Sequence, residues 1–400
     1  MTWSRLRLRA SSCPGRNSDG GSELRLVLTV EGYAPAIGGC ERVVQRIAEG
    51  LAARGHEVHV VTGGQREDTE LGGVHVHRLP VSGNQTRGIR GDASLVTSVI
   101  QRIEPDLVFN YMAQTWTTDC CFAMLERDDR PRMVMAPCGF SGIGKPRYAS
   151  YFAAMPKILR SYDALIFPST RYQDWQFAHR AGAEPIFLVA NGADPATATG
   201  EALRAEIPNG QIVVTIGRHV LSKGHGDFAR LTRKLARGRS LTGVIVAPPR
   251  HGLDALRGCQ PLCHARARMS PNLQVLDGSP PEVVPDALAA ADLFMFTSHL
   301  ESGPLVLLEA MAAGTPWVSL DVGHAAQLPG GIVANGLQDL QEAARQILDG
   351  EHPQLGAQGR DAWEADHRWE TIVADYESVF QDVLARSSEP ELATPAAPEA

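Results

Sequence analysis

Short runs of apolar residues alternate along this chain with longer stretches in which apolar residues recur every three or four positions. An uninterrupted apolar run is typical of a strand buried on both faces of a parallel sheet, whereas the longer period is typical of a covering helix. The first such pair is the run 24–30 followed by 40–55, where Val43, Ile47 and Leu51 share one helix face. The other predicted strands lie at 56–62, 105–111, 132–137, 162–169, 211–217, 241–248, 273–276 and 293–296.

This alternation predicts an α/β fold with two doubly wound, Rossmann-like domains that face each other across a cleft. The domain boundary is expected at 185–194, which ends in the turn-forming residues NGAD. A single amphipathic helix is expected over 363–380, and Pro, Ala and Glu dominate the sequence after it. The predicted parts are a disordered extension at 1–22, domains at 23–192 and 193–362, a helix at 363–385 returning to the first domain, and a disordered tail at 386–400.

The segment 292–320 (DLFMFTSHLESGPLVLLEAMAAGTPWVSL) predicts a strand, a loop, a helix and a second strand. Pro304 suits the first helical position, where no N–H group is needed, and Gly314 suits the residue that ends the helix. The free N–H groups of Leu305 and Val306 then lie at the positive end of the helix dipole. They form a seat for a diphosphate.

Two glutamates flank this seat. Glu301 precedes the helix, and Glu309 lies roughly 7 Å beyond the helix start, at about 1.5 Å per residue. A nucleotide sugar would present hydroxyl groups to both carboxylates, from its hexose at one end and its ribose at the other. Two solvated charges beside an ordinary core helix are the alternative, and the spacing alone favours that alternative.

The longer string ESGPLVLLEAMAAGTPWV closely resembles the signature of retaining glycosyltransferases of the GT-B fold, group 1 (family 4, E-x7-E). This resemblance covers roughly residues 24–380. It implies that Glu301 contacts the donor hexose, that Glu309 holds the ribose, and that the amides between them bind phosphate. It also implies that the first domain binds the acceptor and the second binds the nucleotide sugar. The donor-binding residues expected on this basis are Gly38, Gly39, Arg218, Lys223, Glu301, Ser302, Gly303, Leu305, Val306 and Glu309.

The loop 217–224 (GRHVLSKG) follows a predicted strand directly, so Arg218 and Lys223 lie at a strand's carboxyl end. Two cations there can neutralise a diphosphate leaving group, although in isolation a solvated loop is the favoured interpretation. The string resembles the GR-x4-KG motif of the same family, which implies that both side chains bind the donor phosphates. Arg218, Lys223 and Glu301 are therefore the predicted catalytic residues.

Two further strings resemble family segments. Residues 38–42 (GGCER) resemble the GG-x-E-R loop, so Gly39 is expected to face the donor, with a tight turn that binds no ligand as the alternative. Residues 191–194 (NGAD) resemble the NG-x-D segment at the domain junction, where we expect a hinge.

Other kinds of site are disfavoured. Residues 139–145 (GFSGIGK) nearly form a phosphate-binding P-loop, but Pro146 replaces the hydroxyl residue that would bind Mg²⁺, so an acceptor-side loop is preferred. The sequence has no G-x-G-x-x-G and no Asp-x-Asp, which disfavours a nicotinamide cofactor and the metal clamp of metal-dependent transferases. No cofactor and no metal are expected. Many relatives carry a histidine where this chain has Cys138, which leaves a catalytic imidazole in doubt.

Composition narrows the partners further. A formal net charge of −7 and a pI near 6.0 disfavour nucleic acid. Residues 1–190 hold 22 Lys and Arg against 19 Asp and Glu, which is weak support for peripheral membrane contact through the first domain. Seven cysteines suit a reducing compartment. Cys259, Cys263 and His264 form a C-x3-C-H cluster, but a metal is disfavoured because no second ligand pair lies at zinc-site spacing.

The sequence thus predicts a retaining, metal-independent glycosyltransferase. It would move a hexose from a nucleoside-diphosphate sugar to a glycan or lipid-linked acceptor, in cell-envelope or exopolysaccharide synthesis. No protein nucleophile is nominated, because retention in this family is explained by same-face attack assisted by the leaving phosphate. The protein is expected in the cytoplasm, with the inner face of the plasma membrane as one location. A non-catalytic partner of the same fold is the main alternative, and a nucleotide-sugar epimerase is a weaker one.

Overall fold

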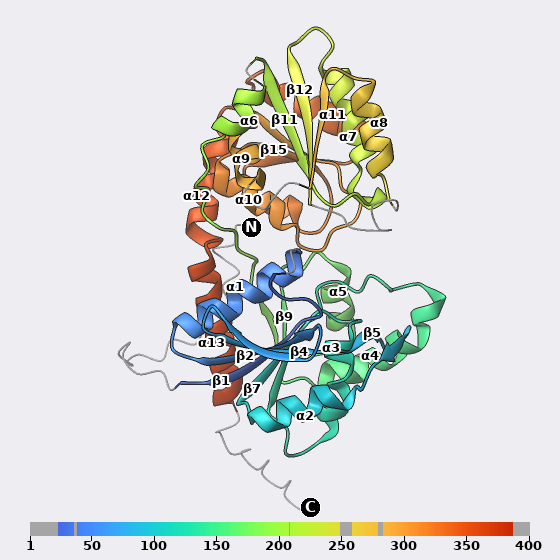
Figure 1. Ribbon diagram of the computed structural model, residues 1–400, viewed down its shortest axis with the longest axis vertical. Helices are drawn as coiled ribbons and strands as arrows, with labels where there is room; N and C mark the ends of the chain where they lie inside the picture. The colour runs from blue at the N-terminus through green and yellow to red at the C-terminus, as the bar shows by residue number, and fades with distance from the viewer. Residues whose placement is uncertain (1–22, 36–37, 208, 249–257, 279–282, 387–400) are drawn as a thin grey trace, which may run out of the picture. The chain divides into compact units, whose positions relative to one another are not determined.

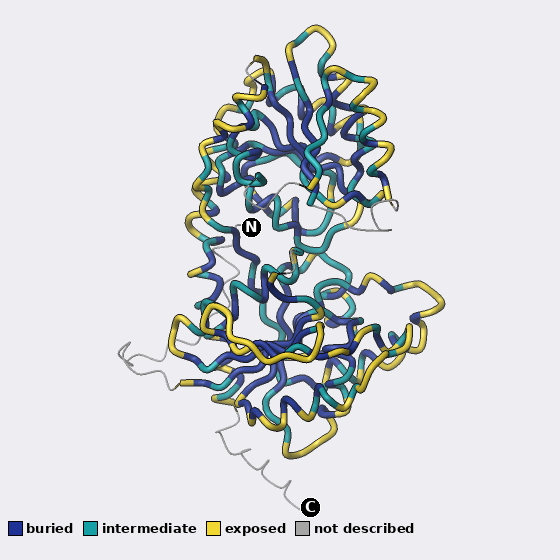
Figure 2. Tube along the Cα trace, in the orientation of Figure 1, coloured by how far each residue is buried: buried dark blue, intermediate teal, exposed yellow. Residues whose placement is uncertain are grey.

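The computed structural model describes residues 23–35, 38–207, 209–248, 258–278 and 283–386 (Figure 1). The disorder predicted for 1–22 and for the tail after residue 386 lies outside these residues. The chain forms two compact units. We call residues 23–167, Gln173–Val189 and 373–386 the N-terminal unit, and Pro168–Tyr172 with Ala190–Ile372 the C-terminal unit. In each unit the central strands of the sheet are buried, and exposure concentrates in the loops, the outer helix faces and edge strands such as Glu67–Leu71 (Figure 2).

The N-terminal unit is built on an eight-stranded sheet of order β10-β9-β8-β7-β1-β2-β4-β3. Its pairs are parallel except β3 with β4, which are antiparallel at one edge. Neither β3 nor β4 was predicted; β3 is exposed throughout and polar except for Leu71. The strands are β1 (Arg25–Thr29), β2 (Glu57–Gly63), β3 (Glu67–Leu71), β4 (Val74–Leu79), β7 (Leu107–Tyr111), β8 (Arg132–Ala136), β9 (Ala164–Phe167) and β10 (Ile186–Leu188).

Helices cover both faces of this sheet, as the unbroken apolar strands require. Val108 packs in a cluster with α2 (Ser94–Ile103), α4 (Ala149–Ser161) and α5 (Gln173–Arg180). Its neighbour Phe109 points to the other face and meets Tyr376 of α13 (Trp369–Ala385), with ring centroids 5.5 Å apart. The remaining elements are α1 (Gly39–Ala53), α3 (Trp116–Asp119) and the hairpin of β5 (Ser82–Asn84) with β6 (Gly88–Arg90).

Helix α1 lies directly against α13. A side-chain carbon on Gly50 would come within 2.5 Å of a Val373 methyl group, so the absence of a side chain permits the close approach. The last helix therefore packs on the N-terminal unit, although it follows the C-terminal unit in sequence.

The C-terminal unit has a six-stranded parallel sheet of order β13-β12-β11-β14-β15-β16. Numbered within the unit, this is the order 3-2-1-4-5-6 of a doubly wound dinucleotide-type fold. One face packs on α9 and α10, and the other packs on α7, α8 and α11. The elements are β11 (Gln211–Ile216), β12 (Leu241–Ala247), β13 (Leu273–Asp277), β14 (Leu293–Phe296), β15 (Trp317–Leu320), β16 (Gly331–Ala334), α6 (Glu201–Glu206), α7 (His225–Leu235), α8 (Gln260–Arg268), α9 (Val283–Ala290), α10 (Leu305–Ala313), α11 (Leu337–Leu348) and α12 (Leu355–Asp366).

The prediction of one helix over 363–380 is wrong, because the chain breaks between α12 and α13. The carbonyl oxygen of His367 accepts a hydrogen bond from the Ala193 amide at 3.0 Å, and Ala193 forms a β-bridge with Arg368. Trp363 also donates its indole N–H to the Ala193 carbonyl. Residues 367 and 368 therefore pair with Ala193 and do not continue the helix. Among the described residues, no helix is both long enough and apolar enough to span a membrane.

Candidate active site

The C-terminal unit has its topological switch point between β11 and β14, because the chain winds away from these neighbouring strands in opposite directions. A crevice opens at the carboxyl ends of two such strands, and ligands bind there in doubly wound folds. The loop after β11 carries Arg218 and Lys223, and the loop after β14 carries Glu301. The three predicted catalytic residues therefore share one edge of one sheet.

Buried hydroxyl groups hold these two loops together. Thr297 Oγ1 donates to the Gly224 carbonyl at 3.1 Å, and Ser298 Oγ lies 3.1 Å from the Ser222 carbonyl. The amide of His299 also donates to the Ser222 carbonyl, at 2.7 Å. Thr297 and Ser298 are both fully buried. A buried and satisfied polar contact of this kind fixes the positions of the side chains that follow it.

Gly224 is required where the first loop turns into α7. Its φ is +68°, in the left-handed region, and a side-chain carbon there would overlap the carbonyl oxygen of Thr297. Any other residue would be strained and would push the two loops apart.

Lys223 and Glu301 form an ion pair, with Lys223 Nζ 2.5 Å from Glu301 Oε1. Ser298 Oγ donates to the same oxygen at 2.5 Å. The two side chains are only 22% and 14% exposed, so water screens the pair weakly. Lys223 Nζ also lies 5.9 Å from the centre of the Phe296 ring. Both of these bonds are made by Oε1 of Glu301, not by Oε2.

Helix α10 begins one residue later than predicted. Leu305 is its first residue and Pro304 is the N-cap, with ψ at 104°, because proline still fixes φ but the helical turn closes only after it. Gly314 ends the helix in the left-handed conformation, as predicted. Leu305, Val306 and Glu309 are half-buried, on the first turns of this helix. The N-terminus of α10 thus directly follows the loop that carries Glu301.

The Ser302–Gly303 step packs against a histidine that the sequence analysis did not single out. A side-chain carbon on Gly303 would lie 3.5 Å from His324 Cε1 and 2.9 Å from Asn191 Nδ2. His324 is 2% exposed, and burial lowers its pKa to about 4 despite a hydrogen bond with the Ser302 backbone. His324 therefore stays neutral at physiological pH and supports the loop as an uncharged group. Its signal in the sequence, a lone histidine after a strand, was too weak to single out.

Arg218 is exposed, whereas the next residue, His219, is buried. His219 Nε2 lies 2.5 Å from Asp277 Oδ1 at the end of β13. A metal at Cys259, Cys263 and His264 was disfavoured because no second ligand pair lies at zinc-site spacing in the sequence. His219 and His225 supply such a pair through the fold, while His264 faces Asp277 instead, at 2.6 Å.

The N-terminal unit holds two candidate phosphate-binding segments, the start of α1 and the loop 139–145. Gly38 is the N-cap of α1 and Gly39 is its first residue. The Glu41 carboxylate folds back over Gly38, so this helix N-terminus already faces an anionic group of its own chain. In the near-P-loop, the Gly139 amide donates to Asp174 Oδ2 at 2.6 Å. An amide that a phosphate would need is therefore engaged by a carboxylate.

Cys138 occupies the strand end where many relatives have histidine, and its φ is +54°. Burial, together with hydrogen bonding to Cys40, raises the pKa of its thiol, which favours the protonated form at physiological pH. Asp119, the last residue of α3, is a buried carboxyl group whose pKa suits proton transfer. Burial raises the pKa of Asp119 to about 6, although the Gln85 amide and the Tyr151 hydroxyl donate to it.

Two family models match the chain. Residues 38–192 match the glycosyl transferase 4-like domain, and residues 210–350 match the glycosyl transferases group 1 family. Over 395 residues the chain is 25% identical to a GDP-mannose-dependent alpha-mannosyltransferase of Corynebacterium glutamicum, covering 91% of this chain and 90% of that protein. A stretch of 109 residues is 35% identical to the N-acetyl-alpha-D-glucosaminyl L-malate synthase of Bacillus anthracis, covering 25% of this chain and 29% of that protein.

Solved structures confirm the predicted fold class. Sucrose-phosphate synthase from Thermosynechococcus elongatus superposes with a TM-score of 0.74 at 18% identity, over 91% of this chain and all of that one. The Anabaena protein HepE, solved with UDP and glucose, superposes with a TM-score of 0.66 at 18% identity, over 90% of this chain and all of that one. The chain therefore belongs to the group 1 glycosyltransferases of the GT-B fold, the family that its sequence resembles.

Proposed function

We propose that this glycosyltransferase moves a hexose from a nucleoside-diphosphate sugar with retention of anomeric configuration and without a metal at the diphosphate. The observation that carries the proposal is the Lys223–Glu301 ion pair, at the switch point and immediately before the N-terminus of α10. Cationic side chains, a helix N-terminus and a carboxylate at one sheet edge are the kinds of group that a diphosphate joined to a sugar requires.

The leaving diphosphate would be stabilised by protein groups alone. Lys223 and Arg218 supply two positive charges, and the amides of Leu305 and Val306 supply donors at a positive dipole end. These groups would stabilise the negative charge that develops as the sugar–phosphate bond breaks. The sequence offers no Asp-x-Asp pair to hold a bridging cation, which supports a metal-independent reaction.

The sugar and ribose ends are assigned to the two glutamates. Glu301 would accept hydrogen bonds from hexose hydroxyls and stabilise an oxocarbenium-like centre, and Glu309 would hold the ribose. The acceptor hydroxyl attacks the anomeric carbon on the face from which the diphosphate departs. The bond from that carbon to the phosphate oxygen breaks with its electron pair, and the hydroxyl proton passes to a departing phosphate oxygen. No side chain acts as nucleophile.

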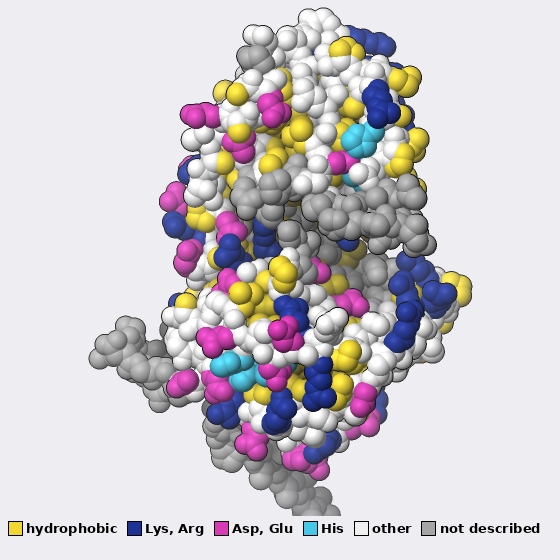
Figure 3. All heavy atoms as spheres, viewed as in Figure 1, with side chains coloured by type: hydrophobic (Ala, Val, Ile, Leu, Met, Phe, Trp, Pro, Cys, Tyr) yellow, Lys and Arg dark blue, Asp and Glu magenta, His cyan; other side chains and the backbone are white. Residues whose placement is uncertain are grey.

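The donor to test first is GDP-mannose, because the relative that matches 91% of this chain carries that donor in its name. UDP-glucose is the second, because HepE was solved with UDP and glucose. The acceptor is assigned as a glycan or lipid-linked sugar of the cell envelope, bound by the N-terminal unit at the cytoplasmic face of the membrane. On the face shown in Figure 3, Lys and Arg side chains gather at one edge of that unit, which suits an anionic surface.

Glu309→Ala should weaken donor binding about 10- to 100-fold, because a hydrogen bond to a charged acceptor contributes roughly 1.5–3 kcal/mol. Calorimetric titration of UDP, GDP and ADP, and then of their sugars, would measure this and would also name the base. Glu206→Ala, an exposed glutamate of α6, is the matched control and should bind like the wild type. Equal affinity in wild type and Glu309→Ala would overturn the ribose assignment.

A non-catalytic partner protein is the second candidate, and the neutral Cys138 in place of a histidine is the observation that favours it. Such a protein would bind the nucleotide sugar but neither transfer nor hydrolyse it. Incubation of the donor with candidate acceptors separates the possibilities: release of nucleoside diphosphate supports the transferase, binding without release supports the partner, and a changed sugar without an acceptor indicates an epimerase.

A further inference from the structure

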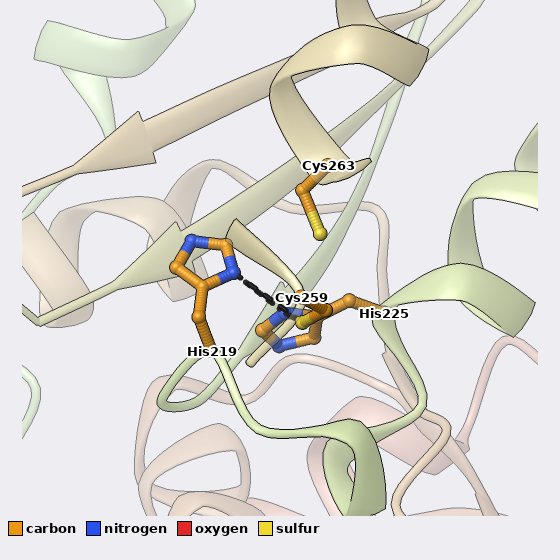
Figure 4. A group of neighbouring side chains, drawn as sticks. All are labelled: His219, His225, Cys259 and Cys263. Carbon is orange, nitrogen blue, oxygen red and sulfur yellow. Dashed lines mark hydrogen bonds between the residues drawn. The ribbon is translucent and has the colours of Figure 1, made fainter. Parts of the chain in front are cut away.

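Two histidines and two cysteines of the C-terminal unit converge on one point (Figure 4). His219 lies in the loop after β11, His225 opens α7, Cys259 is the N-cap of α8, and Cys263 lies in the first turn of α8. All four are buried, with exposures of 1%, 1%, 4% and 0%. One ligand atom from each lies within 4.8 Å of the other three.

The distances on one face of this cluster are those of a tetrahedral metal site. His219 Nδ1 and His225 Nδ1 are 3.3 Å apart, and each lies 3.6 Å from Cys259 Sγ. Around a tetrahedral Zn²⁺ with ordinary bond lengths, two nitrogens lie about 3.4 Å apart and a nitrogen lies about 3.6 Å from a sulfur. Figure 4 shows Cys263 directing its sulfur at this face, as a fourth ligand would.

Asp277 prepares His219 for the role. Its Oδ1 accepts from Nε2 of His219, so the proton is held on Nε2 and the Nδ1 lone pair faces the cluster. A carboxylate behind a histidine is the usual outer contact of a metal-binding imidazole. Gln260 and His264 hold the other oxygen of Asp277, at 2.7 and 2.6 Å. This carboxylate is therefore fixed on both sides.

Hydrogen bonding among the four side chains explains their convergence less well than a bound metal ion does. With its proton on Nε2, His219 presents only an acceptor to its neighbours, and thiols are weak donors. A cation would use all four lone pairs at once.

We propose that His219, His225, Cys259 and Cys263 bind one zinc ion as a structural site. Two imidazole nitrogens and two thiolates favour Zn²⁺ over Mg²⁺ or Ca²⁺, which take oxygen ligands. Four protein ligands close the coordination sphere, so this ion would not touch the substrate. The site is therefore separate from the metal-independent chemistry proposed at the diphosphate, and it does not depend on that proposal.

The zinc would tie the donor loop to α8. His219 and His225 bracket the loop segment that carries Lys223, and the two cysteines anchor it to the start of α8. A surface groove between α7 and α8 is lined by His225 and Cys259, which gives an ion a route to the site. The four ligands act as positioning residues for Lys223, so metal loss should raise KM for the donor as well as lower kcat.

The test measures metal in the full chain, purified without chelators, by inductively coupled plasma mass spectrometry. We expect close to one zinc per chain, and a fall of about tenfold or more in Cys259→Ser and Cys263→Ser. Cys120→Ser is the matched control, because Cys120 belongs to the N-terminal unit and is not one of the four ligands; its zinc content should stay unchanged.

Two measurements on the wild type keep the test independent of variant folding. Cobalt added to the metal-free protein should give the thiolate charge-transfer bands and intense ligand-field bands of a tetrahedral site with two sulfurs. Zinc should protect Cys259 and Cys263 from alkylation, mapped by mass spectrometry, while Cys120 reacts equally with and without it. No bound metal, octahedral cobalt bands, unprotected thiols, or a Cys259–Cys263 disulfide in the native protein would each overturn the proposal.

Discussion

Lys223→Met should lower kcat for sugar transfer by about 10²- to 10³-fold while the protein stays folded. Removing one preorganised group that stabilises developing negative charge typically costs this much. Methionine keeps the aliphatic stem, which packs over Gly217, so packing changes little. The charge is what is lost, and Glu301 is left half-buried without its cation. Steady-state kinetics with a fixed acceptor measures the effect.

Lys234→Met is the control, since Lys234 is exposed on α7, and it should keep wild-type kinetics. A double-mutant cycle with Glu301→Gln tests the pairing itself. Because Lys223 and Glu301 contact each other, the double variant should lose much less than the product of the two single losses. Strict additivity would mean that the ion pair does not act as a unit, and unchanged kcat in Lys223→Met would remove Lys223 from the mechanism.

The sequence predicted what depends on near neighbours. The order of strands and helices follows from local periodicity, and the helix after Glu301 follows from Pro304 and Gly314, which lie ten residues apart. The Pro304 prediction was wrong by one position because the fixed φ of proline suits the N-cap as well as the first helical residue. The family resemblance then supplied roles for these residues that periodicity alone could not.

Contacts between distant segments were not predictable in the same way. Lys223 and Glu301 are 78 residues apart, and their ion pair depends on β11 and β14 being neighbours in the sheet. Sequence reasoning gave both side chains to the ligand and missed that they bind each other. The four-residue metal cluster was missed for the same reason, because its histidines and cysteines come from segments some 34 residues apart or more.

The break between α12 and α13 also depends on a contact between distant segments. The 363–380 pattern is helical throughout, and nothing local stops the helix at His367. The break is caused by Ala193, which takes the His367 carbonyl and pairs with Arg368. A partner about 170 residues away decides the local conformation, so a helical period sets where a helix can form but not where the tertiary structure interrupts it.

Gly224→Ala should be among the most damaging small substitutions in the C-terminal unit. The left-handed backbone alone costs an alanine about 1–2 kcal/mol. The added carbon would also overlap the Thr297 carbonyl oxygen, and overpacking of this kind costs about 1–3 kcal/mol more. Thermal unfolding should show the loss as a lowered midpoint, and donor turnover should fall about 10²-fold, because a shift near 1 Å at Lys223 misplaces the cation.

Gly238→Ala isolates the cause. Gly238 has φ of +78°, close to that of Gly224, but a side-chain carbon there would meet nothing within 4 Å. It should therefore lose only the backbone contribution and keep full turnover. If both variants unfolded at the same temperature, the contact between Gly224 and Thr297 would carry no energy, and the two loops at the switch point would be held by other means. If Gly224→Ala lost stability but kept turnover, the loop could move without displacing Lys223. The site would then tolerate a mobile cation, contrary to the preorganised charge on which the proposed mechanism rests.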